Sequence, residues 1–235
     1  GLGATQGPPL SLDTQLTFVD RDWYCEAIVA PLSTAIRAQL ETQSSDVMAE
    51  ALKLLRPAHQ VLSQDLMAPE RPLILPPTLS LIHLCTYIQW LWIRADPTLM
   101  AWMSGIPVSY LQLGGDWQSG TLVAIGRLEF SHDGDIVERL EVGTGHWQTG
   151  HSLPPEDGIL RLQKPLTHPN QMLWQLTALQ TYLEDCLRQR SPLLARLMAG
   201  TAVKLTPPKA ASGSSSLNTC WQMRFQVPLT FYPFI

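Results

Sequence analysis

The chain has 235 residues, of which 45% are hydrophobic and only 15% are charged, and its formal net charge is −4. A charged fraction well below the usual quarter argues against a disordered chain and indicates a surface that is largely neutral or covered. The small negative charge gives no general attraction to nucleic acid or anionic lipid. We therefore expect a folded chain with a large buried core, as one domain or two small ones.

Helical patterns dominate residues 16–105. Apolar side chains recur at helical spacing three times between residues 32 and 66. The segment 78–94 is apolar all the way round, which predicts a helix buried on every side. A further short helix is expected between Asp96 and Gly105.

An uncharged run from Pro72 to Ile93 raises the question of a membrane span. Pro76 and Pro77 interrupt it and leave about 16 helical residues, fewer than the roughly 20 that a bilayer requires. We interpret the run as a buried core helix and expect no membrane span.

Strand patterns replace helical ones after Ile106. Residues 121–130 alternate, and Leu122, Ala124, Leu128 and Phe130 share one face. Asp133-Gly134 predicts a hairpin turn followed by a return strand over 136–142.

One long amphipathic helix is predicted after Pro169. Its apolar stripe comprises Met172, Leu176, Leu179, Leu183 and Cys186. Residues 207–218 are rich in Pro, Gly and Ser and are expected to form a flexible linker.

The C-terminal segment gives the clearest strand signal, because large apolar residues occupy every odd position over 221–231. A strand on a flexible tether can pair with its own sheet or with a sheet edge of another protein. The apolar face, which we predict as partner-binding, comprises Trp221, Met223, Phe225, Val227, Leu229 and Phe231.

Together these patterns predict an α+β fold. It would have a helical N-terminal half with a buried central helix, an antiparallel sheet built from the middle of the chain and the C-terminal strand, and one long amphipathic helix between them. We expect a single domain over 1–235. The alternative is a helical subdomain over 16–105 and a sheet-plus-helix subdomain over 106–235.

Four cysteines are spread along the chain without a C-x-x-C pair: Cys25, Cys85, Cys186 and Cys220. This spacing favours free thiols in a reducing compartment, although two disulfides are an alternative. We expect a cytoplasmic protein.

Histidines and carboxylates near the predicted hairpin suggest a metal site. His132, Asp133 and Asp135 lie at its tip, and His146 and His151 follow the return strand. Seven strand residues at ~3.3 Å each would separate the two groups by about 20 Å. We therefore predict no metal site, and no motif indicates a catalytic residue or a cofactor.

The loop predicted over 143–152 is the best candidate for a ligand site. Trp147 and His146 could stack on a flat ligand, and we add His151 and Trp117 as ligand-binding candidates. The loop lacks the lysine of a phosphate-binding loop.

Basic residues between Arg188 and Lys209 form one positively charged stretch. Basic side chains late in a helix also favour the helix dipole, which is the ordinary explanation. Nucleic-acid contact is therefore expected only within a larger complex.

Low charge, loop tryptophans and the tethered strand favour a non-enzymatic protein-protein interaction module, an assembly factor or a subunit of a larger complex. Its partner would be another protein or a second copy of itself. The alternative is a small-molecule or metal-binding domain, or an enzyme, that uses the 143–152 loop.

Overall fold

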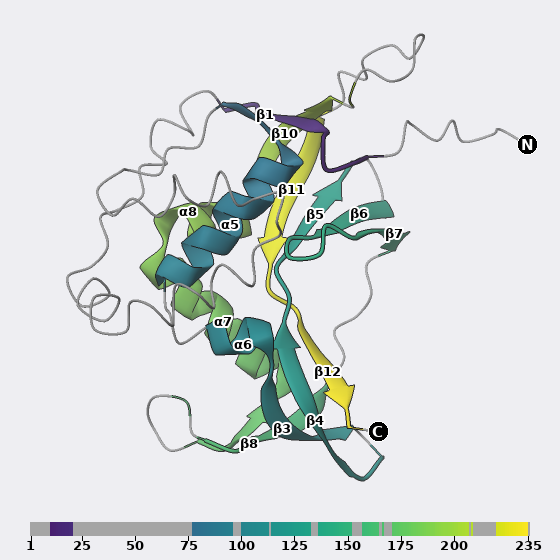
Figure 1. The fold of residues 1–235 in the computed structure, drawn as a ribbon, viewed down its shortest axis with the longest axis vertical. Helices are drawn as coiled ribbons and strands as arrows, with labels where there is room; N and C mark the ends of the chain where they lie inside the picture. Colours follow the sequence, from purple (N-terminus) through teal and green to yellow (C-terminus); the bar gives the residue numbers. More distant parts are fainter. Residues whose placement is uncertain are drawn as a thin grey trace, which may run out of the picture.

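The structure is a computed structural model. It describes residues 10–20, 77–95, 100–112, 114–132, 136–151, 157–164, 166, 171–206, 208 and 220–234. These residues form two antiparallel sheets and four helices (Figure 1).

The first sheet has seven strands and combines both ends of the described chain. In spatial order they are β2 (Thr78–Ser80), β1 (Gln15–Phe18), β10 (Thr201–Thr206), β11 (Cys220–Gln226), β5 (Arg127–Ser131), β6 (Ile136–Glu141) and β7 (Trp147–His151). All neighbours are antiparallel.

The second sheet has five strands, with β3 in the middle. In spatial order they are β12 (Leu229–Pro233), β4 (Trp117–Ala124), β3 (Ile106–Gln112), β8 (Gly158–Leu162) and β9 (Leu173–Gln175). These pairs are also antiparallel.

A bent two-stranded ribbon joins the two sheets (Figure 1). One arm is β4 followed by β5 and the other is β11 followed by β12; β11 pairs with β5, and β12 pairs with β4. Both arms bend at the same level, where the Ile125 amide donates to the Pro228 carbonyl at 2.9 Å. Pro228 has no N–H to continue a ladder, and a Cβ on Gly126 would lie 3.3 Å from both Phe225 and Trp92.

Four helices pack on the inner faces of the sheets. They are α5 (Leu81–Ala95), α6 (Met100–Ser104), α7 (Leu176–Arg190) and α8 (Pro192–Ala199). α7 buries Leu176, Leu179, Leu183 and Leu187. α8 begins at Ser191, whose hydroxyl accepts a hydrogen bond from the Leu194 amide. Among these described helices, none has the length and apolarity that crossing a membrane requires.

The predicted α+β fold with a helical N-terminal half is wrong, because the described chain is mainly strand. Before residue 105 it contains β1 and β2 as well as α5 and α6. β1 is short and pairs with β10, about 190 residues later in the chain, so local periodicity could not reveal its sheet. The helices expected between residues 32 and 66 lie outside the described residues.

One hydrophobic cluster includes buried residues of both sheets and all four helices. The predicted single domain, and the alternative division at residue 105, stay predictions. Of the predicted linker 207–218, only Pro208 is described.

Candidate functional site

The candidate site is the outer face of the five-stranded sheet, opposite to the face on which α6 and α7 pack. Residues directly opposite one another in an antiparallel sheet point to the same side. The register therefore places Trp117, Leu111, Ile159 and Gln175 in one row across four strands. The next row contains Ser119, Ser109, Arg161 and Leu173.

The edge strand β12 adds two aromatic residues to this face. Tyr232 pairs with Thr121, which shares the outward side with Trp117 and Ser119. The Phe234 amide donates to the Ser119 carbonyl at 3.0 Å, which places Phe234 in the row of Ser109. The burial pattern agrees, because alternate residues of β3 and β8 are buried under the helices.

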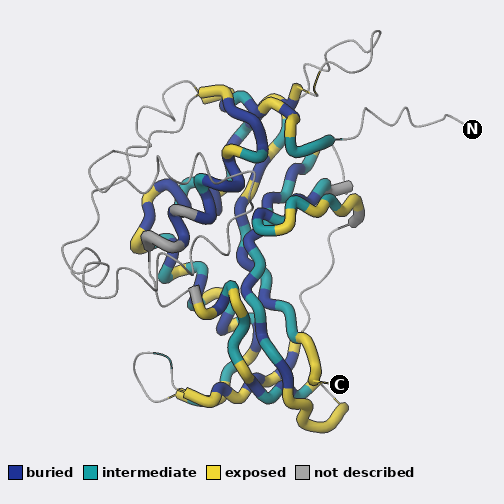
Figure 2. Tube along the Cα trace, viewed as in Figure 1, coloured by how far each residue is buried: buried dark blue, intermediate teal, exposed yellow. Residues whose placement is uncertain are grey.

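Exposed apolar residues concentrate on this face. Among the described residues, six large hydrophobic side chains are exposed: Val19, Trp117, Ile159, Leu173, Tyr232 and Phe234. All except Val19 lie on the outer face or the β12 edge of the five-stranded sheet. Figure 2 shows many exposed residues at the lower end of this sheet, whereas the ribbon that joins the two sheets is mainly buried or half-buried. Apolar residues that gather on one face mark an interaction surface more often than scattered ones do.

Arg161 is the charged side chain inside the two rows. Its guanidinium carbon lies 4.6 Å from the centre of the Trp117 ring, which is a cation-π arrangement. This contact fixes both long side chains over β3, between the strands that carry them. Trp117 is still 41% exposed, so one large aromatic surface is held in place and open to a partner.

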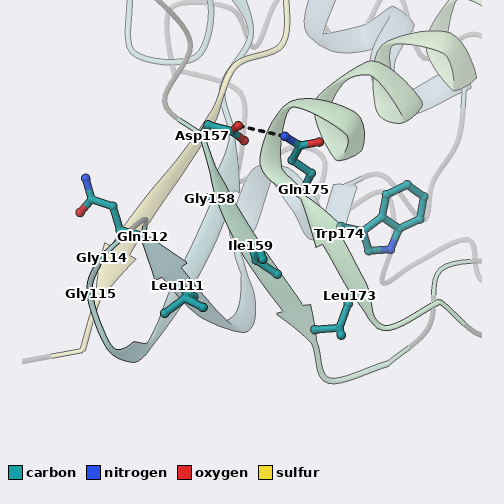
Figure 3. Close-up of a pocket in the computed structure, with 10 residues that line it drawn as sticks. All are labelled: Leu111, Gln112, Gly114, Gly115, Asp157, Gly158, Ile159, Leu173, Trp174 and Gln175. Atoms are coloured by element: carbon teal, nitrogen blue, oxygen red, sulfur yellow. Dashed lines mark hydrogen bonds between the residues drawn. The ribbon is translucent and has the colours of Figure 1, made fainter.

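A hollow of about 600 Å³ lies beside these residues, where β3 and β9 end and β8 begins. In Figure 3, Leu111, Ile159 and Leu173 point to the same side, whereas Trp174 points away from them. Trp174 instead contacts Tyr182 of α7, with ring centres 5.3 Å apart. The polar end of the hollow is closed by Gln175, whose amide donates to the Asp157 carboxylate at 2.9 Å (Figure 3).

Trp117 is the one predicted ligand-binding residue that lies at this site. His146 and Trp147 belong to the other sheet, where His146 is exposed in the turn before β7 and Trp147 begins that strand. The indole of Trp147 packs on Phe130, with ring centres 5.8 Å apart, so Trp147 lies at the edge of the hydrophobic core. The structure therefore does not unite Trp117 with Trp147 in one ligand site.

The predicted 143–152 loop is instead a turn followed by β7, and this changes the position of His151. His151 pairs with Ile136, next to Val137, which pairs with Ser131. The backbone of His151 therefore lies level with the last residues of β5, next to His132. Two strand spacings, or about 10 Å, separate the backbones of His151 and His132. The predicted separation of about 20 Å holds for His146 but is wrong for His151.

His132 has partners of its own. Its Nδ1 lies 3.1 Å from the Cys220 carbonyl oxygen, and its ring lies 5.5 Å from the Trp221 ring centre. Asp133 and Asp135 lie outside the described residues. Across the ranges that the structure describes, no three His, Cys, Asp or Glu side chains gather where they could hold a metal ion.

The predicted partner-binding face of the terminal strand points into the chain's own core. Met223, Phe225, Val227 and Leu229 are buried, and Trp221 and Phe231 are half-buried. Their alternation matches the sequence pattern, and the strand pairs with β4, β5 and β10. A role in partner binding stays a prediction for these residues, and the proposals below rest on the opposite, outward side of β12.

Two residues of the basic stretch form ion pairs. Arg188 contacts Glu184 and Asp185 at 3.1 and 2.7 Å. Arg196 contacts Asp20 at 3.0 Å. These ion pairs account for Arg188 and Arg196 within the chain, without a nucleic-acid ligand.

Sequence reasoning missed the outward role of Ile159, Leu173, Tyr232 and Phe234. Ile159 alternates with Leu160, but the sequence does not say which of the two faces the helices. The sequence pattern predicts Leu173 within the long helix, whereas it lies in β9 and the helix begins at Leu176. The sequence does indicate the outward position of Tyr232, because the alternation of the terminal strand places residue 232 on its polar side.

Comparisons with known proteins add no functional assignment: no family model, curated protein or solved structure matches this chain.

Proposed function

We propose that this chain is a non-enzymatic protein-protein interaction module, acting as an assembly factor or as a subunit of a larger complex. Its contact surface is the outer face of the five-stranded sheet. The observation that carries the proposal is that, of the six large hydrophobic side chains that are exposed in the described part of the chain, five share this face or its edge.

The energetics of this face favour a protein partner. Complete burial of one large apolar side chain contributes about 1.5–3 kcal/mol. The five side chains are between 41% and 63% exposed, so each has a substantial fraction of that energy left to gain. Trp, Tyr and Arg are the residues that most often dominate binding energy in interfaces, and Trp117, Tyr232 and Arg161 supply all three.

We place this module in the cytoplasm. Among the described residues, Cys186 and Cys220 carry free thiols, which supports a reducing compartment.

A site-specific photo-crosslinker tests the proposal. Ser109 lies in the middle of the outer face and would be replaced by benzoylphenylalanine in cells that express the full chain. Gln222 is exposed on the outer side of the seven-stranded sheet and provides the matched control. We expect irradiation to link another protein molecule to position 109 and not to position 222. Equal labelling at both positions, or none at position 109, would overturn the proposal.

A second candidate function is the binding of a small apolar ligand, which the hollow lined by Leu111, Ile159 and Leu173 favours. Its volume is within the range of small-molecule pockets, and the Asp157–Gln175 pair offers polar groups at one end. A thermal-shift screen of small molecules on the wild-type chain and on Ile159→Glu tests it. A ligand of this hollow would raise the melting temperature of the wild type alone, whereas equal shifts in both proteins would reject the site.

A further inference from the structure

We propose that the outer face of the five-stranded sheet is covered by a second copy of this chain, in a two-fold dimer whose axis runs along β3. The inference rests on the proposed function, because it names the partner of the same surface. It is carried by the arrangement of the exposed residues about the middle strand.

The sheet order β12-β4-β3-β8-β9 places equal numbers of strands on each side of β3. A two-fold axis along β3, midway between two facing sheets, therefore places β4 of one copy over β8 of the other. It also places β12 over β9. An interface of this kind requires one surface to be complementary to itself.

The first complementary pair is Trp117 and Ile159. Both are in register with Leu111 of β3, one strand to either side. The axis along β3 brings Trp117 of each copy onto Ile159 of the other, while the two Leu111 side chains meet at the axis. Both pairing residues are exposed in the single chain, at 41% and 45%.

The second pair is Phe234 and Leu173, two strands to either side of Ser109. Phe234 belongs to this row because its amide donates a hydrogen bond to the Ser119 carbonyl. Leu173 belongs to it because Leu173 pairs with Arg161, which pairs with Ser109. The same axis brings Phe234 onto Leu173 of the second copy. Two rows thus place exposed apolar residues at equal distances from β3.

The shape of the surface agrees with this pairing. The bulky Trp117 lies on the β4 side of the axis, and the hollow lies on the β8 and β9 side. The proposed axis directs each Trp117 toward the hollow beside Ile159 of the other copy. The large side chain of one half of the face therefore meets the concave part of the other half, twice in each dimer.

One charged group of the face works against self-association. Each Arg161 lies opposite Ser119 of the other copy, because β8 faces β4. Its guanidinium reaches over β3 to the Trp117 ring, so the two guanidinium groups of a dimer approach the axis and repel each other. Salt screens this repulsion, with a screening length of ~8 Å at physiological concentration.

The area is sufficient for a dimer. Five strands at ~4.8 Å spacing, five to six residues long on average, give a flat face of about 450 Å². Two such faces give about 900 Å², close to the ~1,000 Å² at which specific interfaces begin, which is the size expected of a weak dimer.

Light scattering on the full chain tests the dimer directly. A concentration series up to about 200 µM populates a dimer with a micromolar dissociation constant, and we expect the mass to double. Trp117→Lys alone and Ile159→Glu alone should each weaken dimerisation at least tenfold. Val19→Lys is the matched control, because Val19 is 43% exposed but lies beside the other sheet, and it should keep the wild-type dissociation constant.

Mixing the two interface variants tests the axis itself. A heterodimer of Trp117→Lys and Ile159→Glu has one unchanged Trp117–Ile159 contact and one Lys–Glu pair. We expect the mixture to dimerise more tightly than either variant alone. If residue 117 instead faced residue 117 of the other copy, mixing would restore neither contact, and the absence of rescue would overturn the inference.

A second set of variants guards against failure to fold. Leu173→Glu and Phe234→Lys repeat the design on the other pair, and both positions are exposed, so melting temperatures should stay within about 2 °C of wild type. A wild-type chain that stays monomeric throughout the series overturns the dimer. If crosslinking at position 109 then captures a different protein, the proposed function stands without the dimer; if it captures nothing, both are overturned.

Discussion

Glu184 tests how the bend between β11 and β12 is stabilised. Its Oε1 accepts a hydrogen bond from the Val227 amide at 3.2 Å, where Val227 is completely buried and the strand leaves the first sheet. The same carboxylate contacts Arg188 at 3.1 Å. Replacing Glu184 by Ala removes these interactions and a longer hydrogen bond from the Gln180 amide at 3.4 Å, whereas replacing it by Gln keeps an oxygen acceptor for Val227.

The expected energies differ because the two interactions differ in exposure. The Arg188 side chain is 36% exposed, so its pair with Glu184 contributes only about 0.3–0.5 kcal/mol. A buried amide left without an acceptor costs about 1–3 kcal/mol. We therefore expect Glu184→Gln to lower the free energy of unfolding by about 0.5 kcal/mol and Glu184→Ala by about 1.5–3 kcal/mol.

Urea unfolding followed by tryptophan fluorescence measures both losses, with an unchanged m-value as the condition for comparing midpoints. Hydrogen exchange at the Val227 amide provides a local readout and should accelerate in the Ala variant only. The reasoning is refuted if the Ala and Gln variants lose the same stability, because the hydrogen bond to Val227 would then contribute nothing.

Three further substitutions have defined outcomes. Gln89→Leu should raise the melting temperature in a thermal scan, because neither amide atom of this buried side chain has a hydrogen-bond partner among the described residues. A lower melting temperature would contradict the view that the buried amide destabilises the fold. Gly120→Ala should expose the β12 amides to hydrogen exchange, since its Cβ would collide with the Tyr232 carbonyl oxygen; protected amides would count against that collision. Leu194→Ala should cost about 2–5 kcal/mol in urea unfolding, as a completely buried leucine, and a cost below 1 kcal/mol would mean that the site collapses around the smaller residue.

Local side-chain alternation predicted the buried side of several strands correctly. Leu122, Ala124, Leu128 and Phe130 are all buried, as the alternation over 121–130 indicates. Glu138 interrupts the apolar face of β6, and the structure explains how: its carboxylate accepts a hydrogen bond from the Thr149 hydroxyl at 2.7 Å. Burial of every other residue is a local property of a strand, so the sequence is sufficient to show it.

The bends in the ribbon could not be read from the same pattern. Residues 121–130 were predicted as one strand, yet they divide between two sheets at Ile125 and Gly126. The alternation continues across the bend in phase, so it gives no warning. Pro228 was a local signal on the opposite arm, but the close packing of Gly126 against Phe225 exists only after the chain has folded.

The sequence by itself determined the apolar alternation of the terminal strand and the buried positions Leu176, Leu179 and Leu183 of α7, because both depend on the spacing of neighbouring residues. Met172 lies before the helix and Cys186 is half-buried, while Leu187 takes the next buried position. Only the tertiary structure decided that Trp117, Ile159, Leu173 and Phe234 share one outward face. These residues come from four strands that are distant in the sequence, and their side is set by which face of the sheet the helices cover. Strand order and helix placement arise from long-range pairing, which local periodicity does not encode.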